Sequence, residues 1–136
     1  MIGKIDNLLN FQGEALKLRA QRQEVIASNL ANSDTPHYKA VDFKFSDALR
    51  QATGMPSATG ATPALLQTNA GHMNAGGSTL STVQLLYRNP TQASVDGNTV
   101  DMNIEQASFA DNAVRYEASL RFLNGQIKTM LSAIQG

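Results

Sequence analysis

Both ends of this chain carry apolar residues at helical spacing, and this placement constrains the fold more than any other feature of the sequence. Close to the C-terminus, apolar or nearly apolar side chains recur at steps of three and four, the spacing of one face of an amphipathic helix. These residues are Phe109, Ala113, Tyr116, Leu120, Leu123, Ile127, Met130 and Ile134. Chain ends fray unless other parts of a structure hold them. We therefore expect the two ends to hold each other and to be held by neighbouring molecules.

The first 32 residues predict a second long helix with two overlapping apolar seams. One seam contains Ile5, Leu9, Leu16, Ile26 and Leu30, and the other contains Phe11, Leu18 and Val25. Together they form a face wider than the seam of a two-stranded coiled coil, so part of it is expected to contact other subunits. The sequence predicts a mainly α protein in which segments 1–32 and 102–136 pack as a coiled-coil hairpin and form one core domain. The second helix is expected to begin at Asp101 or Asn103.

The middle of the chain, residues 33–101, differs in kind from the two ends. Residues 51–87 contain no Asp, Glu, Lys or Arg. Ser46 is placed to cap a short helix over 46–51. The tract 52–80 is rich in Ala, Gly, Ser and Thr, which predicts a flexible loop. β-branched residues in 81–100, with a tight turn at Asp96 and Gly97, predict a small β-element in an otherwise irregular segment.

Composition argues against several classes of function. The chain has 11 basic and 11 acidic side chains and no net charge, whereas a dedicated nucleic-acid binder carries a basic patch. It has no Cys, and its two histidines, His37 and His72, have no neighbouring ligands for a metal. It contains no nucleotide-binding loop and no nucleophile motif. We therefore expect no metal, no cofactor and no enzymatic activity.

The sequence also carries no sign of a membrane segment or of a cleaved signal. No apolar run approaches the roughly 18 residues that a membrane helix needs. The first 20 residues lack the apolar core and small-residue cleavage site of a secretory signal. We expect a chain that does not span a membrane and that is cytosolic or exported without a cleaved signal.

The sequence ASNLANSDTPHYKA over residues 27–40 is more specific than a helical pattern of apolar residues. It resembles the signature of the bacterial flagellar axial proteins, the family of rod, hook and hook-associated subunits. That signature runs S-x-N-[IL]-A-N, two variable residues, and T-P-G-[FY]-[KR]. The matching residues are Ser28, Asn29, Leu30, Ala31, Asn32, Thr35, Pro36, Tyr38 and Lys39. His37 stands where the family usually has Gly, and His enters the left-handed backbone region more readily than most residues.

The resemblance extends to both terminal thirds of the chain. Residues 11–23, 96–101 and 132–136 are similar to the B-type proximal rod subunits of that family. This likeness implies terminal helices packed as a coiled coil, which line the inner tube of a helical assembly. It implies export from the cytoplasm by the flagellar type III apparatus and a place in the basal body, in the rod that spans the periplasm.

The resemblance also implies a function and a set of partners. The partners would be other copies of the chain, other proximal rod proteins, and the junction protein at the MS ring. The function would be that of a structural subunit in the drive shaft that transmits torque from motor to hook and encloses the export channel. The helices alone leave open a second class, a soluble helical-hairpin adaptor or export chaperone that binds a partner helix.

Overall fold

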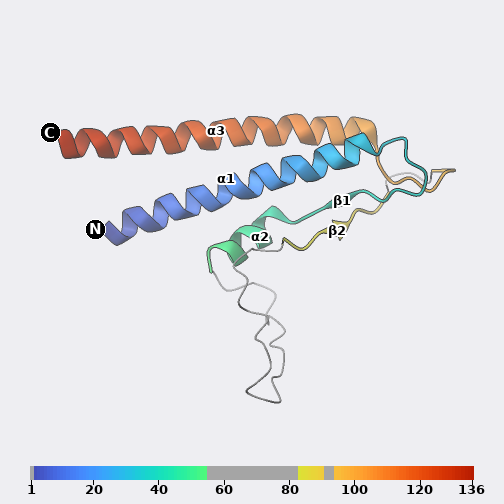
Figure 1. The fold of residues 1–136 in the computed structure, drawn as a ribbon, viewed down its shortest axis with the longest axis horizontal. Helices are drawn as coiled ribbons and strands as arrows, with labels where there is room; N and C mark the ends of the chain where they lie inside the picture. The colour runs from blue at the N-terminus through green and yellow to red at the C-terminus, as the bar shows by residue number, and fades with distance from the viewer. Residues whose placement is uncertain (1, 55–82, 91–93) are drawn as a thin grey trace, which may run out of the picture.

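A computed structural model describes residues 2–54, 83–90 and 94–136 of the chain. The elements follow in the order α1 (Ile2–Ala31), β1 (Val41–Asp42), α2 (Phe45–Ala52), β2 (Leu86–Tyr87) and α3 (Met102–Gln135). The two long helices pack against each other, and a small two-stranded sheet lies in the middle of the chain, which confirms the predicted fold class (Figure 1). The helices lie closest where α1 ends and α3 begins, and they diverge toward the two termini.

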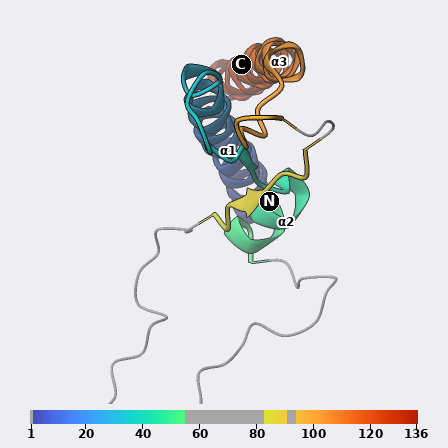
Figure 2. The same ribbon diagram turned by 90° about the vertical axis from the view of Figure 1, so that its right-hand side faces the viewer.

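Helix α1 forms the centre of the molecule, with α3 on one side and α2 and the strands on the other (Figure 2). The buried apolar cluster lies on the second of these sides, where Leu18 of α1 packs with Phe43 and Ala48. Around it lie half-buried apolar residues, Val25 from α1 and the others from both ends of the middle segment: Phe45, Leu49, Ala52 and Val83. The core of the fold therefore joins α1 to the middle segment rather than to α3.

The helix ends differ slightly from the sequence expectations. Asp101 is the N-cap of α3, and its carboxylate accepts hydrogen bonds from the backbone N–H groups of Asn103 and Ile104. This arrangement satisfies two of the amides that the first turn of a helix leaves without partners. Helix α2 begins one residue before the predicted segment, after Lys44, which makes no side-chain cap. Ser46 therefore lies inside the helix, and its predicted role as cap was wrong.

The small sheet joins segments on either side of α2. Strands β1 and β2 are antiparallel, with Val41 opposite Tyr87 and Asp42 opposite Leu86. The segment 81–100 thus supplies one strand, and its partner comes from before α2. The turn near Asp96 is closed by a hydrogen bond from Gly97 N to Ser94 O, at 3.3 Å. Of the predicted flexible tract 52–80, residues 55–80 lie outside the described part of the chain.

Candidate functional site

The signature residue Asn29 binds the backbone of β1 as a neighbouring strand would. Its side chain is fully buried near the end of α1. The amide nitrogen donates to Val41 O at 2.7 Å, and the amide oxygen accepts from Val41 N at 3.1 Å. The hydroxyl of Tyr38 donates to the same oxygen at 3.2 Å. Asn29 therefore fixes the position of the chain that leaves the helix.

A second buried amide, Asn98, ties the end of α1 to the segment that leads into α3. Its side-chain nitrogen lies 3.0, 2.7 and 2.8 Å from the carbonyl oxygens of Asn32, Ser33 and Thr35. These carbonyls belong to the turn that follows α1, where no regular secondary structure supplies their partners, so this side chain donates to them instead. Its own oxygen accepts from Val100 N at 2.8 Å. Together, Asn29 and Asn98 hold the turn after α1 from two sides.

The other signature residues build the turn itself. Asn32 donates through its side chain to Ser28 O at 2.8 Å and accepts from the Thr35 hydroxyl at 3.2 Å. The Ser28 hydroxyl lies 3.5 Å from that of Tyr38. Leu30 is half-buried, and the remaining signature positions are exposed: Ala31, Pro36 and Lys39. The turn thus contains both buried anchors and side chains that face outward.

His37 occupies the left-handed region of the backbone, with φ of 61°. His37, which stands where the signature has Gly, therefore adopts the backbone conformation that favours Gly. Its N–H donates to Asp96 O at 3.0 Å, and its ring lies against Gly97. Hydrogen bonds from the Ser94 hydroxyl and the Asn98 N–H hold the pKa of Asp96 below its ordinary value. The predicted turn residues, Asp96 and Gly97, are thus in direct contact with the signature turn.

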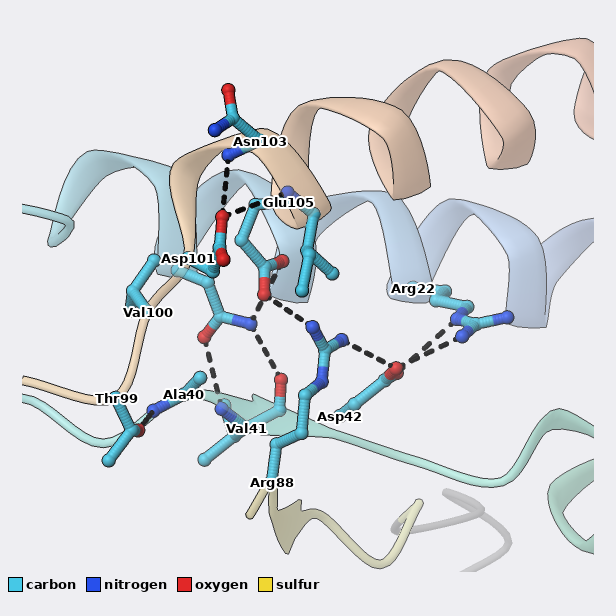
Figure 3. A network of polar contacts seen from close by, with 12 residues as sticks. Arg22, Ala40, Val41, Asp42, Arg88, Thr99, Val100, Asp101, Asn103 and Glu105 are labelled. Carbon is cyan, nitrogen blue, oxygen red and sulfur yellow. Dashed lines mark hydrogen bonds and ion pairs between the residues drawn. The ribbon is translucent and has the colours of Figure 1, made fainter. Parts of the chain in front are cut away.

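A chain of charged side chains crosses from α1 to α3 by way of β1 and the residue after β2 (Figure 3). Arg88 donates to Glu105 at 2.6 Å and to Asp42 at 2.9 Å, while Arg22 binds the same Asp42 carboxylate at 3.0 Å. The Glu105 side chain is only 1% exposed, and the Asn29 amide lies 3.4 Å from it. The spacing of residues along the sequence did not indicate that these four charged residues bind one another. They come from α1, β1, the residue after β2 and α3.

Burial and hydrogen bonding act in opposite directions on the pKa of Asp42. Burial disfavours its charged form, but the hydrogen bonds from Arg22, from the Phe43 N–H and from Arg88 together outweigh it. The pKa of Asp42 therefore lies below its ordinary value. The carboxylate is charged at neutral pH and binds both Arg22 and Arg88.

The contact between α1 and α3 is polar at its centre. The two buried side chains of α3, all of whose residues the structure describes, are Glu105 and Asn112. The Asn112 amide nitrogen donates to Arg19 O at 2.9 Å and to the side-chain oxygen of Gln23 at 2.6 Å. Burial, and after it the nearby charge of Arg115, lower the pKa of Arg19. The helices meet through hydrogen bonds as well as through apolar contact.

The apolar seam predicted for α3 lies largely at the surface. Phe109, Tyr116 and Ile127 are 37%, 38% and 40% exposed, and Ile134 is 82% exposed. Ala113 is exposed as well, whereas three members of the seam are half-buried: Leu120, Leu123 and Met130. We call this set of eight residues the α3 stripe. None of its members is fully buried in the chain's own fold.

The seams predicted for α1 are covered unevenly. Leu18 and Ile26 are buried, Ile5 is exposed, and the others are half-buried: Leu9, Phe11, Leu16, Val25 and Leu30. Between the diverging ends of the two helices lies an open groove of about 570 Å³. Its apolar lining includes Leu8, Leu9 and Phe122. The half of the helix pair nearest the termini is therefore the less completely packed half.

Within residues 2–54, 83–90 and 94–136, no three His, Asp or Glu side chains are grouped as a metal site requires. None of the helices in these ranges is long and apolar enough to cross a membrane.

The fold and the signature turn correspond to a known class of protein. The model of the family described as "Flagella basal body rod protein" matches residues 9–39, which include most of α1 and the turn after it. Individual relatives match almost the whole chain. The flagellar basal body rod protein FlgB of Yersinia enterocolitica is 47% identical over 135 residues, which cover 99% of this chain and 98% of that protein.

Two further relatives agree with this result. FlgB of Escherichia coli (strain K12) is 47% identical over 135 residues, with the same coverage of both chains. FlgB of Salmonella typhimurium is 44% identical over 136 residues, which cover 100% of this chain and 99% of that protein. The chain belongs to the family of flagellar basal body rod proteins named FlgB, and its place is the flagellar basal body.

Proposed function

We propose that the chain is a non-enzymatic structural subunit of the rod and that it assembles with its neighbours through the α3 stripe and the diverging ends of α1 and α3. The observation that carries this proposal is that the fold of the single chain leaves much of the apolar surface of α3 uncovered. The helix buries two polar side chains against α1 and leaves Phe109, Tyr116 and Ile127 at the surface. A contiguous exposed apolar surface is typical of a protein that is completed by an interface.

The polar junction supplies the rigidity that such a subunit needs. Asn29, Asn98 and Arg88 connect α1, the strands and the start of α3 through buried or half-buried hydrogen bonds. Each element is therefore held relative to the others at one end of the helix pair. A shaft that transmits torque from motor to hook needs subunits that do not deform at such a joint.

The neighbours follow from the same surfaces. Identical subunits that meet through unlike surfaces form rings, or helical filaments when the rotation does not close. We propose that the stripe of one chain meets other copies and other proximal rod proteins, with the basal-body junction protein at the MS ring as a further neighbour.

The assembled helices would enclose the export channel, and the chain itself would reach the rod through the flagellar type III apparatus. Near-full-length similarity to rod proteins favours this function over that of a soluble adaptor.

A charge on the α3 stripe tests the proposal. Ile127→Asp places a carboxylate in the stripe at a position that is already 40% exposed, so the purified chain should keep the helix content of the wild type. In cells that produce only this variant, we expect loss of swimming in soft agar and basal bodies that lack an assembled rod. Circular dichroism, swimming and electron microscopy of isolated basal bodies measure the three outcomes.

The matched control is Ala118→Asp, which adds the same charge at an exposed position of α3 outside the stripe. We expect cells with this variant to swim. Normal swimming with a folded Ile127→Asp chain would contradict assembly through the stripe.

A further inference from the structure

We infer that Asn112 sets the rotation of α3 about its own axis and thereby keeps the first three residues of the α3 stripe, Phe109, Ala113 and Tyr116, facing outward. Asn112 is a positioning residue in this sense: it acts on the orientation of the helix and not on a partner molecule. The inference rests on the geometry of the helix pair alone. It can therefore fail or hold independently of the proposed function.

The first step is the contact itself. Asn112 is 3% exposed, and its amide donates to a backbone carbonyl, Arg19 O, and to the side chain of Gln23. A backbone carbonyl cannot move to follow its donor. The bond to Arg19 O at 2.9 Å therefore requires this face of α3 to point at α1.

The second step is the angle between this contact and the stripe. Successive residues of a helix are about 100° apart, so Tyr116 lies roughly 40° and Phe109 roughly 60° around α3 from Asn112. A rotation of that size would turn this part of the stripe toward α1. It would also carry the Asn112 amide away from Arg19 O and leave a buried donor without its partner, which is unfavourable.

The third step is that α1 offers this part of the stripe an apolar partner. Leu16 is half-buried and lies on the same side of α1 as Arg19 and Gln23, three and seven residues away. Burial of these stripe residues against that side would remove apolar surface from water, which is favourable. A hydrophobic seam alone would favour the rotated helix. Glu105 lies one heptad before Asn112 on the same face of α3, and it is buried in the same way.

A buried polar residue at a helix–helix contact has a known physical use of this kind. In coiled coils, one buried Asn selects a particular arrangement at some cost in stability. Because such an Asn lowers the stability of the coiled coil, its replacement by an apolar residue of similar volume is expected to be neutral or stabilising. For Asn112 we therefore expect a loss of orientation without a loss of stability.

The test uses the absence of Cys from the chain, since a single introduced thiol is then the only one. Ala113 belongs to the stripe and Ala118 lies outside it, and both are exposed. Ala113→Cys and Ala118→Cys are each combined with Asn112→Leu in the full-length chain. The rate of thiol modification by a maleimide reports the exposure of each position, and circular dichroism reports folding.

We expect Asn112→Leu to slow the modification at position 113 by roughly tenfold, equivalent to about 1.4 kcal/mol of local protection. The rate at position 118 should not change, and the melting temperature should be equal to that of the wild type or higher. Asn124→Leu makes the same change at an exposed position of α3 and should alter neither rate.

Two results would overturn the inference. One is a folded Asn112→Leu chain in which the thiol at position 113 reacts as fast as in the wild type. The other is loss of helix content in both Asn112→Leu and Asn112→Ala while Asn124→Leu remains folded. That result would mean that Asn112 is needed for stability and does not select an orientation.

Discussion

The imidazole of His37 lies directly over Gly97, in the position that a side chain at residue 97 would need. A Cβ on Gly97 would stand 2.9 Å from His37 Nδ1, closer than such atoms approach in proteins. Both residues have positive φ, 61° and 74°. The turn after α1 and the turn before α3 therefore fit together through one left-handed histidine and one glycine.

Gly97→Ala should destabilise the chain more than Gly54→Ala does. Both glycines have positive φ, at which a non-glycine residue costs about 1–2 kcal/mol. A Cβ on Gly54 meets no atom of the described residues within 4 Å, so only Gly97→Ala must also displace the His37 ring. We expect the difference to be roughly 0.5–1.5 kcal/mol, the cost of an off-rotamer side chain.

Urea unfolding followed by circular dichroism measures both variants. In a His37→Gly background the ring is gone, and Gly97→Ala should cost no more than Gly54→Ala. An undiminished difference in that background would show that the contact with His37 is not its cause.

Asn29→Asp should strongly destabilise the junction between α1 and β1. The substitution removes the donor to Val41 O and places a carboxylate beside the buried Glu105, at the site of the present 3.4 Å contact. An uncompensated buried charge typically costs about 3–5 kcal/mol. Asn29→Ala removes the hydrogen bonds without adding a charge and should cost less, about 1–3 kcal/mol.

Thermal or urea unfolding at pH 7 distinguishes these variants. The matched control is Asn103→Asp, because Asn103 is exposed in the first turn of α3, where an acid interacts favourably with the helix dipole. It should be neutral or slightly stabilising. Equal effects of Asn29→Asp and Asn103→Asp would contradict the role given to the Asn29 amide.

The stability of the chain should depend on pH through Asp42. Its folded-state pKa is lowered, so its contribution is fully present above the unfolded-state value of about 3.9. That contribution is lost as the pH falls below this value and through the folded-state pKa. Asp42→Asn removes it at every pH and should flatten the stability profile in acid.

Unfolding free energies measured from pH 6 downward test this expectation. Asp111→Asn is the control, because Asp111 pairs with Arg115 on an exposed face of α3 where ion pairs contribute little. Its profile should follow that of the wild type. If Asp42→Asn and the wild type lose stability in parallel, then the ion pairs of Asp42 are not the source of the acid dependence.

Periodicity was sufficient to predict the two long helices because each repeats its apolar pattern over many turns. It could not say which face of α3 meets α1. The apolar face was the natural expectation, yet buried Glu105 and Asn112 point inward instead. Short-range sequence patterns contain no information about hydrogen-bond partners that lie far away in the chain. Asn112 and Arg19, for example, are separated by 93 positions.

The candidate site was only partly visible in the sequence for the same reason. The signature marked Asn29 and the turn, because both lie within one continuous stretch. Asn98 was contained in the matched segment 96–101, but nothing local distinguished it from an ordinary turn residue. Arg88 and Glu105 resembled solvated charges until the fold placed them 2.6 Å apart. A charged residue beside a charge-free tract was the one signal that could have identified Arg88.

Ala52 and Val83 lie near the two ends of the charge-free stretch 51–87, and both pack on the same cluster around Leu18. The two ends of the segment between them are therefore anchored at one place in the fold. Because residues inserted between these ends would not have to span the fold, we expect a cost near that of loop closure, about 0.6 kcal/mol for each doubling of length. This segment is therefore a suitable insertion site for epitopes or fluorescent reporters, with both of its ends on the side of α1 opposite to α3.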